Sequence, residues 1–439
     1  MRQIVKFLII LLILMVTFLM TACGGNSGIN KAIENGDLEA VRARLEKDPA
    51  ALNMFDEEGY TLVHRAAQMG QKEILGFLLE KGAALEVKTR DVNGFRPLHL
   101  AVNRGNKACV EMLMARDVDV NAVARVRVGG PNFQRWTPLC FAVWKGHEDV
   151  VKVLIAGGAE LNPAAPVTIA PLALAVLKGN VPLARLLTEK GVKVDARPHH
   201  GLTTLFWAVY RGDLDMVKLL VEKGAEVNKR IYRQLTPLHY AVYWDKGWPG
   251  IVRFLIENGA EVDAKCEEEN TPLHYAAIYG FDECVKVLLE KGASLHAVNM
   301  YGSTPLHRAA FRGRKKTVRL LLSLHTAAGK GDLAAVAALL KKYPRMINSR
   351  DDEWKTPLHH AADNNQLKAA ELLIANGADV NAKSRKKRVD LLHGVVGKLL
   401  VPRVGRVKYV KNEKKPLDLA LQKGYTQMAQ LLEGNGAIE

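Results

Sequence analysis

The sequence predicts an all-α fold, a solenoid of about twelve helix-turn-helix units with short β-hairpin loops between them. Three observations predict it. The segment Thr-Pro-Leu-His occurs in full at Thr236, Thr271, Thr304 and Thr356, and Thr271 and Thr304 are 33 residues apart. Paired apolar residues follow each copy, and glycines close the apolar stretches. One such unit cannot bury its own apolar face, so neighbouring units must stack to form the core.

Each unit is expected to hold two short antiparallel helices. A Thr followed by a Pro supplies a helix N-cap and a first helical residue whose missing N–H costs nothing. The first helix ends at a glycine such as Gly280, in the left-handed conformation that glycine adopts readily. The second helix carries helical apolar spacing, as at Val285, Leu288 and Leu289, and Gly292 stops it before the hairpin.

The first position of the unit recurs along most of the chain. Its occupants are Thr61, Arg96, Thr137, Ala170, Thr203, Thr236, Thr271, Thr304 and Thr356. Residues 27–59 and 415–439 lack the full segment and are expected to cap the array. A unit of this length that begins Thr-Pro-Leu-His resembles the ankyrin repeat, and the resemblance covers nearly all of residues 27–435.

One irregular step divides the array. The 52 residues from Thr304 to Thr356 contain an extra unit that follows Ser323 with no hairpin before it. A break or bend in the stack is therefore expected near Ser323. It would separate an N-terminal array over residues 27–323 from a C-terminal array over residues 324–439.

The first 22 residues have the pattern of a signal peptide. Arg2 and Lys6 precede an apolar run over residues 7–20, which is shorter than the roughly 20 residues that span a bilayer. Residues 1–22 are therefore expected to direct export and to be removed.

The end of this segment resembles the lipobox of bacterial lipoproteins. Ala22-Cys23-Gly24 matches the motif, although Met20 stands where the motif prefers Leu. The resemblance implies a lipidated (palmitate-type acyl) Cys23 and a short linker over residues 23–26, and two acyl chains already suffice for stable anchoring. It further implies the outer membrane, facing the periplasm. A secreted form and an inner-membrane anchor are the alternatives.

Composition and motifs favour binding over catalysis. The sequence contains no nucleophile-elbow, zinc-protease or Walker motif and no C-x-x-C pair, so we expect no enzyme activity, no cofactor and no metal site. The formal charge of +16 favours anionic partners, but an export signal disfavours nucleic acid. Seven histidines stand fourth in the Thr-Pro-Leu-His segment and are expected to hydrogen-bond backbone and Thr groups. They are His64, His99, His239, His274, His307, His325 and His359.

Aromatic residues gather at positions that the stack does not need. In ankyrin stacks, partners contact the hairpin tips and the ends of the first helices on the concave face. Only 6% of the residues are aromatic, yet these positions within residues 133–312 are rich in Trp, Tyr and Arg, which dominate interface hot spots. The predicted partner-binding residues are Trp136, Trp144, Tyr210, Arg211, Tyr232, Tyr243, Trp244, Trp248, Tyr279, Tyr301, Phe311 and Arg312. The alternative is that some of these rings pack on one another.

Three insertions interrupt the repeat. Residues 125–134 lengthen one hairpin, and residues 245–248 lengthen one turn between helices. The longest insertion, residues 383–414, interleaves cations with apolar residues and either lies on an anionic surface or packs as a loop on the last repeats. Its predicted anion-binding residues are Arg385, Lys386, Lys387, Arg388, Arg403, Arg406 and Lys408.

These features predict a membrane-tethered module that binds an unidentified protein partner. The resemblance to bacterial ankyrin lipoproteins implies that it acts as a scaffold or as an immunity or inhibitor-type binder, through the concave face of the solenoid. The alternative is a basic protein that binds an anionic envelope polymer or lipid. Salt separates the two, because complexes dominated by charge weaken steeply as salt rises.

Overall fold

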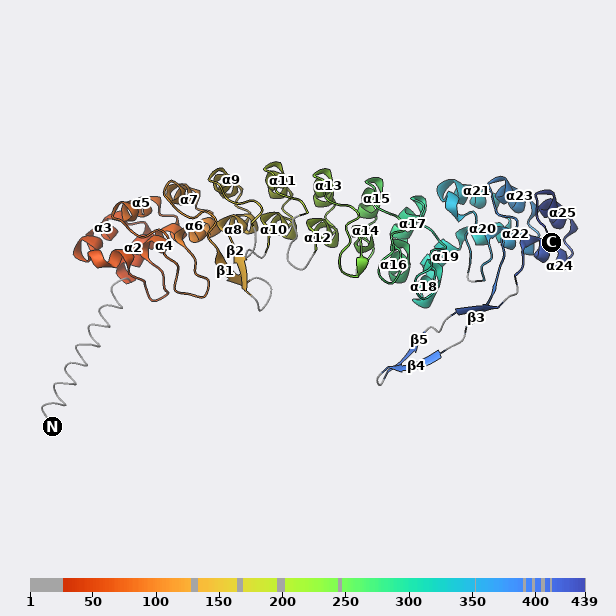
Figure 1. The fold of residues 1–439 in the computed structure, drawn as a ribbon. Coiled ribbons are helices and arrows are strands. Elements are labelled where there is room, and N and C mark those ends of the chain that lie inside the picture. The colour runs from red at the N-terminus through yellow and green to blue at the C-terminus, as the bar shows by residue number, and fades with distance from the viewer. Residues whose placement is uncertain are drawn as a thin grey trace, which may run out of the picture. The chain divides into compact units, whose positions relative to one another are not determined.

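The computed structural model confirms the expected all-α fold of stacked helix pairs (Figure 1). It describes residues 27–127, 133–163, 169–195, 202–243, 247–351, 353–389, 392–396, 399–403, 407–410 and 413–438. The chain divides into two compact units, residues 1–207 and 208–439, and each is described by itself. Residues 1–26, with the predicted signal segment and Cys23, lie outside the described residues.

The first unit is a series of helix pairs. The first helices of successive pairs pack on one another, from α2 to α10, and the second helices form a parallel row from α3 to α9. Its elements are α2 (Ser27–Asn35), α3 (Leu38–Lys47), η1 (Pro49–Asn53), α4 (Leu62–Met69), α5 (Lys72–Glu80), α6 (Pro97–Arg104), α7 (Lys107–Met114), β1 (Ala124–Arg127), β2 (Phe133–Trp136), α8 (Pro138–Lys145), α9 (Glu148–Ala156), α10 (Pro171–Lys178) and α11 (Val181–Glu189).

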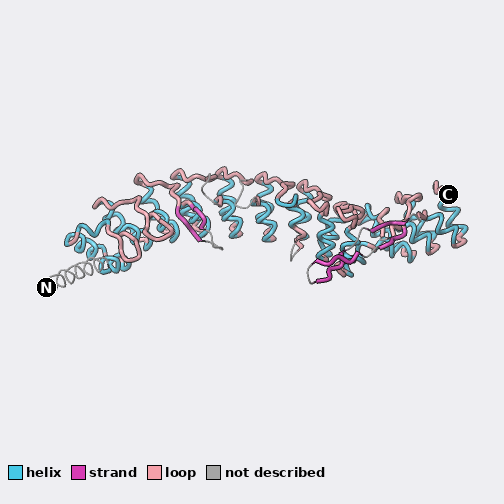
Figure 2. Tube along the Cα trace, turned by 60° about the horizontal axis from the view of Figure 1, so that its bottom comes forward, coloured by secondary structure: helices cyan, strands magenta, loops and turns pink. Residues whose placement is uncertain are grey.

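The second unit repeats the same arrangement, with its loops gathered along the helix ends (Figure 2). Helix α12 (Thr204–Arg211) begins in the first unit and ends in the second. The further helical elements are α13 (Leu214–Glu222), η3 (Tyr232–Gln234), α14 (Pro237–Tyr240), α15 (Pro249–Glu257), α16 (Pro272–Tyr279), α17 (Asp282–Glu290), α18 (Pro305–Phe311), α19 (Lys315–Leu321), α20 (Ser323–Lys330), α21 (Leu333–Lys342), η4 (Pro344–Met346), α22 (Pro357–Asp363), α23 (Leu367–Ala375), α24 (Pro416–Gln422) and α25 (Thr426–Gly434).

Buried histidines join several repeats to the next hairpin, and their bonds to backbone groups are those that the sequence predicted. In α16, the backbone N–H of Thr271 donates to Nδ1 of His274 over 3.1 Å. The other ring nitrogen, Nε2, therefore carries the proton, and it donates to the carbonyl of Ser303 over 2.9 Å. The same ring-to-carbonyl bond recurs in other repeats. It joins His99 to Ala122, His239 to Asn270 and His359 to Lys414.

The local cap signals also act as predicted. Thr271 adopts an extended conformation before the first helical residue, Pro272, and Gly280 ends the helix with φ 78°. That φ lies in the left-handed region, which costs a residue with a Cβ about 1 kcal/mol. The four described cysteines are buried and free, as expected of small apolar side chains.

The second unit contains the irregular step. Leu322 alone separates α19 from α20, so no hairpin lies between them. The hairpins on either side meet instead, because the guanidinium of Arg345 donates to the carbonyl of Gly292. The boundary between the compact units lies after Trp207, whereas Ser323 lies inside the second unit. The division and the bend expected at Ser323 stay predictions.

The three insertions take different forms. Residues 125–134 lengthen a hairpin, in which β1 pairs antiparallel with β2. Near residues 245–248, α14 stops at Tyr240 and α15 starts only at Pro249. Residues 383–414 contain two antiparallel strand pairs. They are β3 (Lys386–Val389) with β6 (Val407–Val410) and β4 (Leu392–Val396) with β5 (Leu399–Arg403). In the described part of the chain, no helix is long and apolar enough to cross a membrane.

The buried histidines predict a stability that falls in acid. Burial lowers the pKa of five rings from 6.5 to about 4. These rings are His99, His239, His274, His325 and His359. Between pH 6.5 and pH 4 these histidines are protonated in the unfolded chain but neutral in the folded chain. The stability that the neutral rings contribute is therefore fully present above pH 6.5 and is lost as the pH falls toward 4.

For each ring, we expect the free energy of unfolding to fall by about 2 kcal/mol between pH 6.5 and pH 5. Thermal unfolding followed by circular dichroism at pH 7 and pH 5 measures this effect. The expected result is a clearly lower midpoint at pH 5, and a His274→Gln variant should show a smaller difference between the two pH values. An unchanged or higher midpoint at pH 5 would contradict the role given to the rings.

Candidate functional site

A cluster of aromatic rings occupies the first-helix side of the second unit. The tyrosine cluster consists of Tyr240, Tyr243, Tyr275, Tyr279 and Phe281. The ring centre of Tyr243 lies 5.1 Å from that of Tyr275 and 5.8 Å from that of Tyr279, and both pairs are edge-to-face. The ring of Tyr279 stacks on that of Phe281 at 5.6 Å. Such pairs contribute about 0.5–1.5 kcal/mol each beyond the area that they bury, so the rings hold one another in place.

The lengthened turn after α14 is what allows this cluster. Because α14 stops at Tyr240, the chain at Tyr243 leaves the helical path and its ring reaches the next repeat. Glycines let the turn approach its neighbours. A Cβ at Gly247 would lie 2.7 Å from Phe281, and a Cβ at Gly212 would lie 2.3 Å from the indole of Trp248. Trp248 is therefore a packing residue of the turn.

The residues of the tyrosine cluster differ in how deeply they are buried. Tyr275 is buried, and its hydroxyl lies 3.5 Å from the sulfur of Cys266. Burial raises the pKa of Tyr240, Tyr275 and Tyr279, so these phenols stay neutral and can donate hydrogen bonds at physiological pH. Tyr243 and Tyr279 are only half-buried. They form a firm aromatic layer between the core and the surface.

The exposed part of the site lies on the neighbouring hairpin tips. Tyr232 is 85% exposed, Met300 58% and Tyr301 55%. The tips are joined by backbone bonds, because Glu267 N–H donates to the Arg233 carbonyl and Met300 N–H donates to the Glu268 carbonyl. The guanidinium of Arg233 also pairs with the carboxylate of Glu268. Together with Phe311, which is 50% exposed at the end of α18, the three exposed side chains form what we call the aromatic rim.

The structure therefore sorts the residues predicted in the second unit. Tyr210, Arg211, Tyr232, Tyr301, Phe311 and Arg312 are exposed. Tyr243, Trp248 and Tyr279 are half-buried, and Trp244 lies outside the described residues. The sequence left two alternatives open, exposed residues or rings that pack on one another. The structure shows both, because some of these rings pack on one another and others face solvent.

In the first unit the expected exposure of Trp136 is wrong. Its side chain is 1% exposed, and its ring contacts Phe141 at 5.3 Å and Trp144 at 5.5 Å. The reason is strand alternation, because β2 places Phe133 and Arg135 outward and turns Trp136 into the core. Trp144 is half-buried, with the ammonium of Lys178 3.9 Å above its ring.

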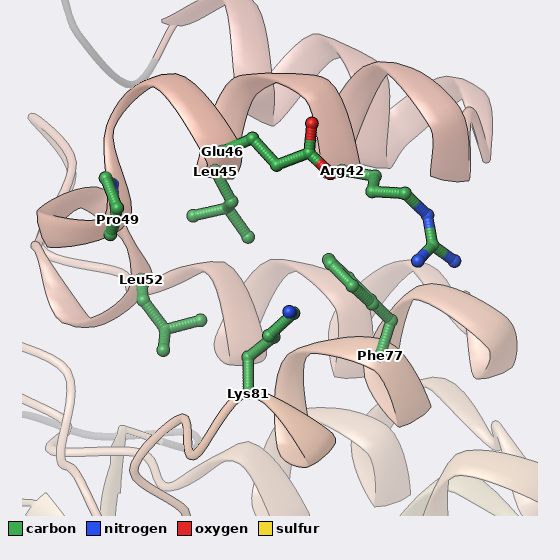
Figure 3. A pocket seen from close by; sticks show the side chains of 7 residues that line it. All are labelled: Arg42, Leu45, Glu46, Pro49, Leu52, Phe77 and Lys81. Carbon is green, nitrogen blue, oxygen red and sulfur yellow. The ribbon is translucent and has the colours of Figure 1, made fainter.

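The first unit also has a hollow that the sequence did not indicate. A pocket of about 250 Å³ opens between α3, η1 and α5, on the row of second helices (Figure 3). Leu45, Leu52 and Phe77 form its apolar lining, and the cations of Arg42 and Lys81 lie 4.7 and 5.7 Å from the Phe77 ring centre. The sequence analysis considered only hairpin tips and the ends of first helices, so it could not have predicted a pocket among the second helices.

The basic insertion is anchored at its base. Lys383 and Arg385 share the carboxylate of Glu413 at 3.0 and 3.8 Å. Within the strands, the register places Arg388 opposite Lys408. Lys386, Lys387 and Arg403 also lie in these strands, and Arg406 lies outside the described residues.

Comparison with known protein families identifies the repeat. The family model described as "Ankyrin repeats (3 copies)" matches residues 2–91, 84–165, 167–231, 238–324 and 323–384. A Rickettsia bellii protein named for its ankyrin repeats is 31% identical over 131 residues, which are 30% of this chain and 67% of that protein.

Two further relatives are animal proteins. The nuclear factor NF-kappa-B p105 subunit of Gallus gallus is 33% identical over 125 residues, 26% of this chain and 13% of that protein. The human transient receptor potential cation channel subfamily A member 1 is 28% identical over 132 residues, 30% of this chain and 12% of that protein. The chain thus spans only a small part of these two relatives.

The packing of the lengthened turn can be tested at Gly212. A Gly212→Ala change meets the Trp248 indole as well as the strain of a left-handed φ of 70°. Gly224→Ala is the matched control, because Gly224 has φ 90° and nothing within 4 Å of the added Cβ. We expect the first change to cost about 1–3 kcal/mol more than the second. Thermal unfolding measures the difference, and equal midpoints would contradict the packing role of Trp248.

Proposed function

The chain belongs to the ankyrin-repeat family, and from that premise we propose that it is a membrane-tethered module that binds another protein through the aromatic rim of its second unit. Ankyrin repeats support a protein-interaction module in general terms. The observation that carries the choice of surface is the exposure of Tyr232, Met300, Tyr301 and Phe311, on two hairpins linked through the hairpin of Glu267 and Glu268 and at the end of α18. Exposed apolar patches of this kind mark interaction sites in soluble domains.

The tyrosine cluster of the same unit supports the same choice. Affinity is lost when side chains or loops must be ordered on binding. Here Tyr243 and Tyr279 are already fixed by ring contacts, and the hairpin tips are joined by backbone hydrogen bonds. A partner would therefore meet a surface that is largely organised in advance. The charged pair of Arg233 and Glu268 at its edge favours a partner with complementary polar groups.

The proposed partner is a protein of the bacterial cell envelope. Either the module holds an envelope enzyme in place, or it masks a toxin as an immunity or inhibitor-type binder. Lipidation of Cys23 would keep the module at the membrane, and the support for it is the lipobox-like sequence around Cys23.

Removing the aromatic rim should abolish binding and spare the fold. The variant is Tyr232→Ser, Tyr301→Ser and Phe311→Ser together. Exposed substitutions usually change stability by less than about 0.5 kcal/mol each, whereas losing an interface hot spot costs about 2 kcal/mol or more, roughly thirtyfold in affinity. The measurement is quantitative capture of partners from envelope extract, with thermal unfolding run in parallel.

The matched control replaces exposed apolar residues away from the rim, Met69, Val92 and Leu421, by Ser. We expect the control to capture the same protein as the wild type and the rim variant to lose it. Equal capture by both variants would remove the rim as the binding surface.

The tether has its own test. A Cys23→Ala variant, expressed in a bacterium with lipoprotein processing, should leave the membrane fraction and lose incorporation of labelled palmitate. Cys109→Ala, at a buried free cysteine, is the control and should keep both properties. Label that persists in the Cys23→Ala chain would mean that Cys23 is not the lipidated residue.

A second candidate function concerns the basic insertion, as a binder of an anionic envelope polymer or lipid. The observation that favours it is the pairing of Arg388 with Lys408 in the β3–β6 ladder. Cations interleaved with apolar residues, as in the sequence of this insertion, are typical of segments that lie on an anionic surface. The insertion is closed at its base, because Ser384 Oγ donates to the Lys414 carbonyl over 2.9 Å and accepts from the Lys414 N–H over 3.3 Å.

Replacing residues 386–411 by a short Gly-Ser turn tests this candidate. The closed base should preserve the last repeats, so the thermal midpoint should stay close to that of the wild type. Binding to phosphatidylglycerol vesicles should be lost, and wild-type binding should weaken steeply with salt. Unchanged vesicle binding by the shortened chain would contradict the assignment, whatever the result for the aromatic rim.

A further inference from the structure

The missing hairpin before α20 creates a pocket in the second unit. Without it, the hairpin that precedes α18 meets the hairpin that precedes α22, and Arg345 bridges them through the Gly292 carbonyl. Figure 1 shows α19 leading directly into α20. Between the two hairpins lies a pocket of about 260 Å³. Its lining residues are His296, Thr304, Arg350, Asp351 and Trp354.

The cation of this pocket has no carboxylate partner among the described residues. Arg350 is half-buried, and its Nη1 donates to the Lys383 carbonyl over 3.4 Å. Its guanidinium also lies 4.8 Å from the ring centre of Trp354. Burial lowers the pKa of Arg350, and the neighbouring charge of Arg385 adds to this effect, against the opposing charge of the Asp379 carboxylate. A partly desolvated guanidinium that lacks an ion pair is one that a bound anion would stabilise.

Trp354 occupies the hairpin position two residues before the N-cap of a first helix, where other repeats have Gly59, Gly94, Gln234, Glu269 and Gly302, all with positive φ. Its φ is 62°, in the left-handed region that a bulky side chain rarely occupies. The guanidinium of Arg385 also lies 4.7 Å from the Trp354 ring centre. The indole thus gives the pocket an apolar wall in contact with two cations.

The carboxylate of the pocket, that of Asp351, already accepts hydrogen bonds from neighbouring groups. The Asp351 carboxylate accepts from Nε2 of His360 at 2.7 Å and from the backbone N–H groups of Glu353 and Lys355 at 2.9 Å each. These bonds lower the pKa of Asp351 and keep it ionised. Its negative charge would repel a doubly charged ligand such as phosphate more than a single carboxylate. Burial lowers the pKa of His296, which is therefore neutral at physiological pH.

We propose that this pocket binds a carboxylate carried on a small apolar body, with the guanidinium of Arg350 holding the carboxylate and the indole of Trp354 covering the apolar part. Arg presents a planar fork that matches a carboxylate in two parallel hydrogen bonds. The volume is just below the roughly 300–1,000 Å³ of typical ligand pockets, so it suits one side-chain-sized group. The ligand is either a small free acid or the carboxyl terminus of a polypeptide. The site shares no residue with the aromatic rim and does not depend on the function proposed for the rim.

The test is isothermal titration of the full chain at constant ionic strength with benzoate, with an acetylated dipeptide ending in Phe, and with inorganic phosphate. We expect saturable one-to-one binding of at least one carboxylate probe and none of phosphate. A preference for benzoate would indicate a free acid, and a preference for the dipeptide would indicate a chain terminus. Arg350→Gln should weaken binding by about tenfold or more. Lys330→Gln, an exposed-surface control on α20, should not change it.

Trp354→Gly separates loss of the site from loss of the fold. Glycine adopts the positive φ without strain, so this variant should keep or raise the thermal midpoint and still lose the carboxylate. Three results would overturn the proposal: equal benzoate and dipeptide binding by wild type and Arg350→Gln, preferential binding of phosphate, or no saturable binding of either carboxylate up to about 10 mM.

Discussion

In the repeats that carry a fourth-place histidine, such as His99, His239, His274 and His359, a buried imidazole ring joins the first helix to the next hairpin. Nδ1 of His274 accepts from the backbone of its own N-cap, and Nε2 donates to Ser303, the residue that precedes the next first helix. A buried polar group is costly unless its hydrogen bonds are made, so the ring specifies both the end of one helix and the place of the next unit. Because a repeat array is stabilised by its neighbours, this bond helps to fix the spacing between the repeats that contain it.

The packing of the stack leaves some positions free to take part in binding. The buried side chains of the first helices pack against neighbouring repeats, whereas the hairpin tips only connect one helix pair to the next. In the second unit the tips carry the exposed Tyr232 and Tyr301, and the rings of Tyr243 and Tyr279 pack edge-to-face at the ends of first helices. The irregularities of the repeat add local features to this plan. A lengthened turn makes room for the tyrosine cluster, and a missing hairpin leaves the pocket beside Trp354.

The sequence was most informative where local chemistry decides the structure. Thr before Pro, the fourth-place His and the closing Gly each act within a few residues, so the repeat and its helices could be predicted. Trp136 shows where this reasoning fails. A fixed offset from the leading Thr predicted a hairpin-tip position, but the inserted strand pair turned the indole inward. The pocket beside Trp354 was also not predictable, because its walls come from hairpins that are neighbours only after one unit loses its loop.

The central claim is that a protein partner contacts the hairpin tips of the second unit, and photo-crosslinking tests it most directly. The full chain would carry a benzoylphenylalanine at position 301 on the tips, or at the exposed position Lys218 on the second helix α13. On irradiation in envelope extract, the account predicts one protein adduct at position 301 and none at position 218. Adducts of the same protein at position 218, with none at position 301, would place the binding surface on the opposite row of helices and contradict the account.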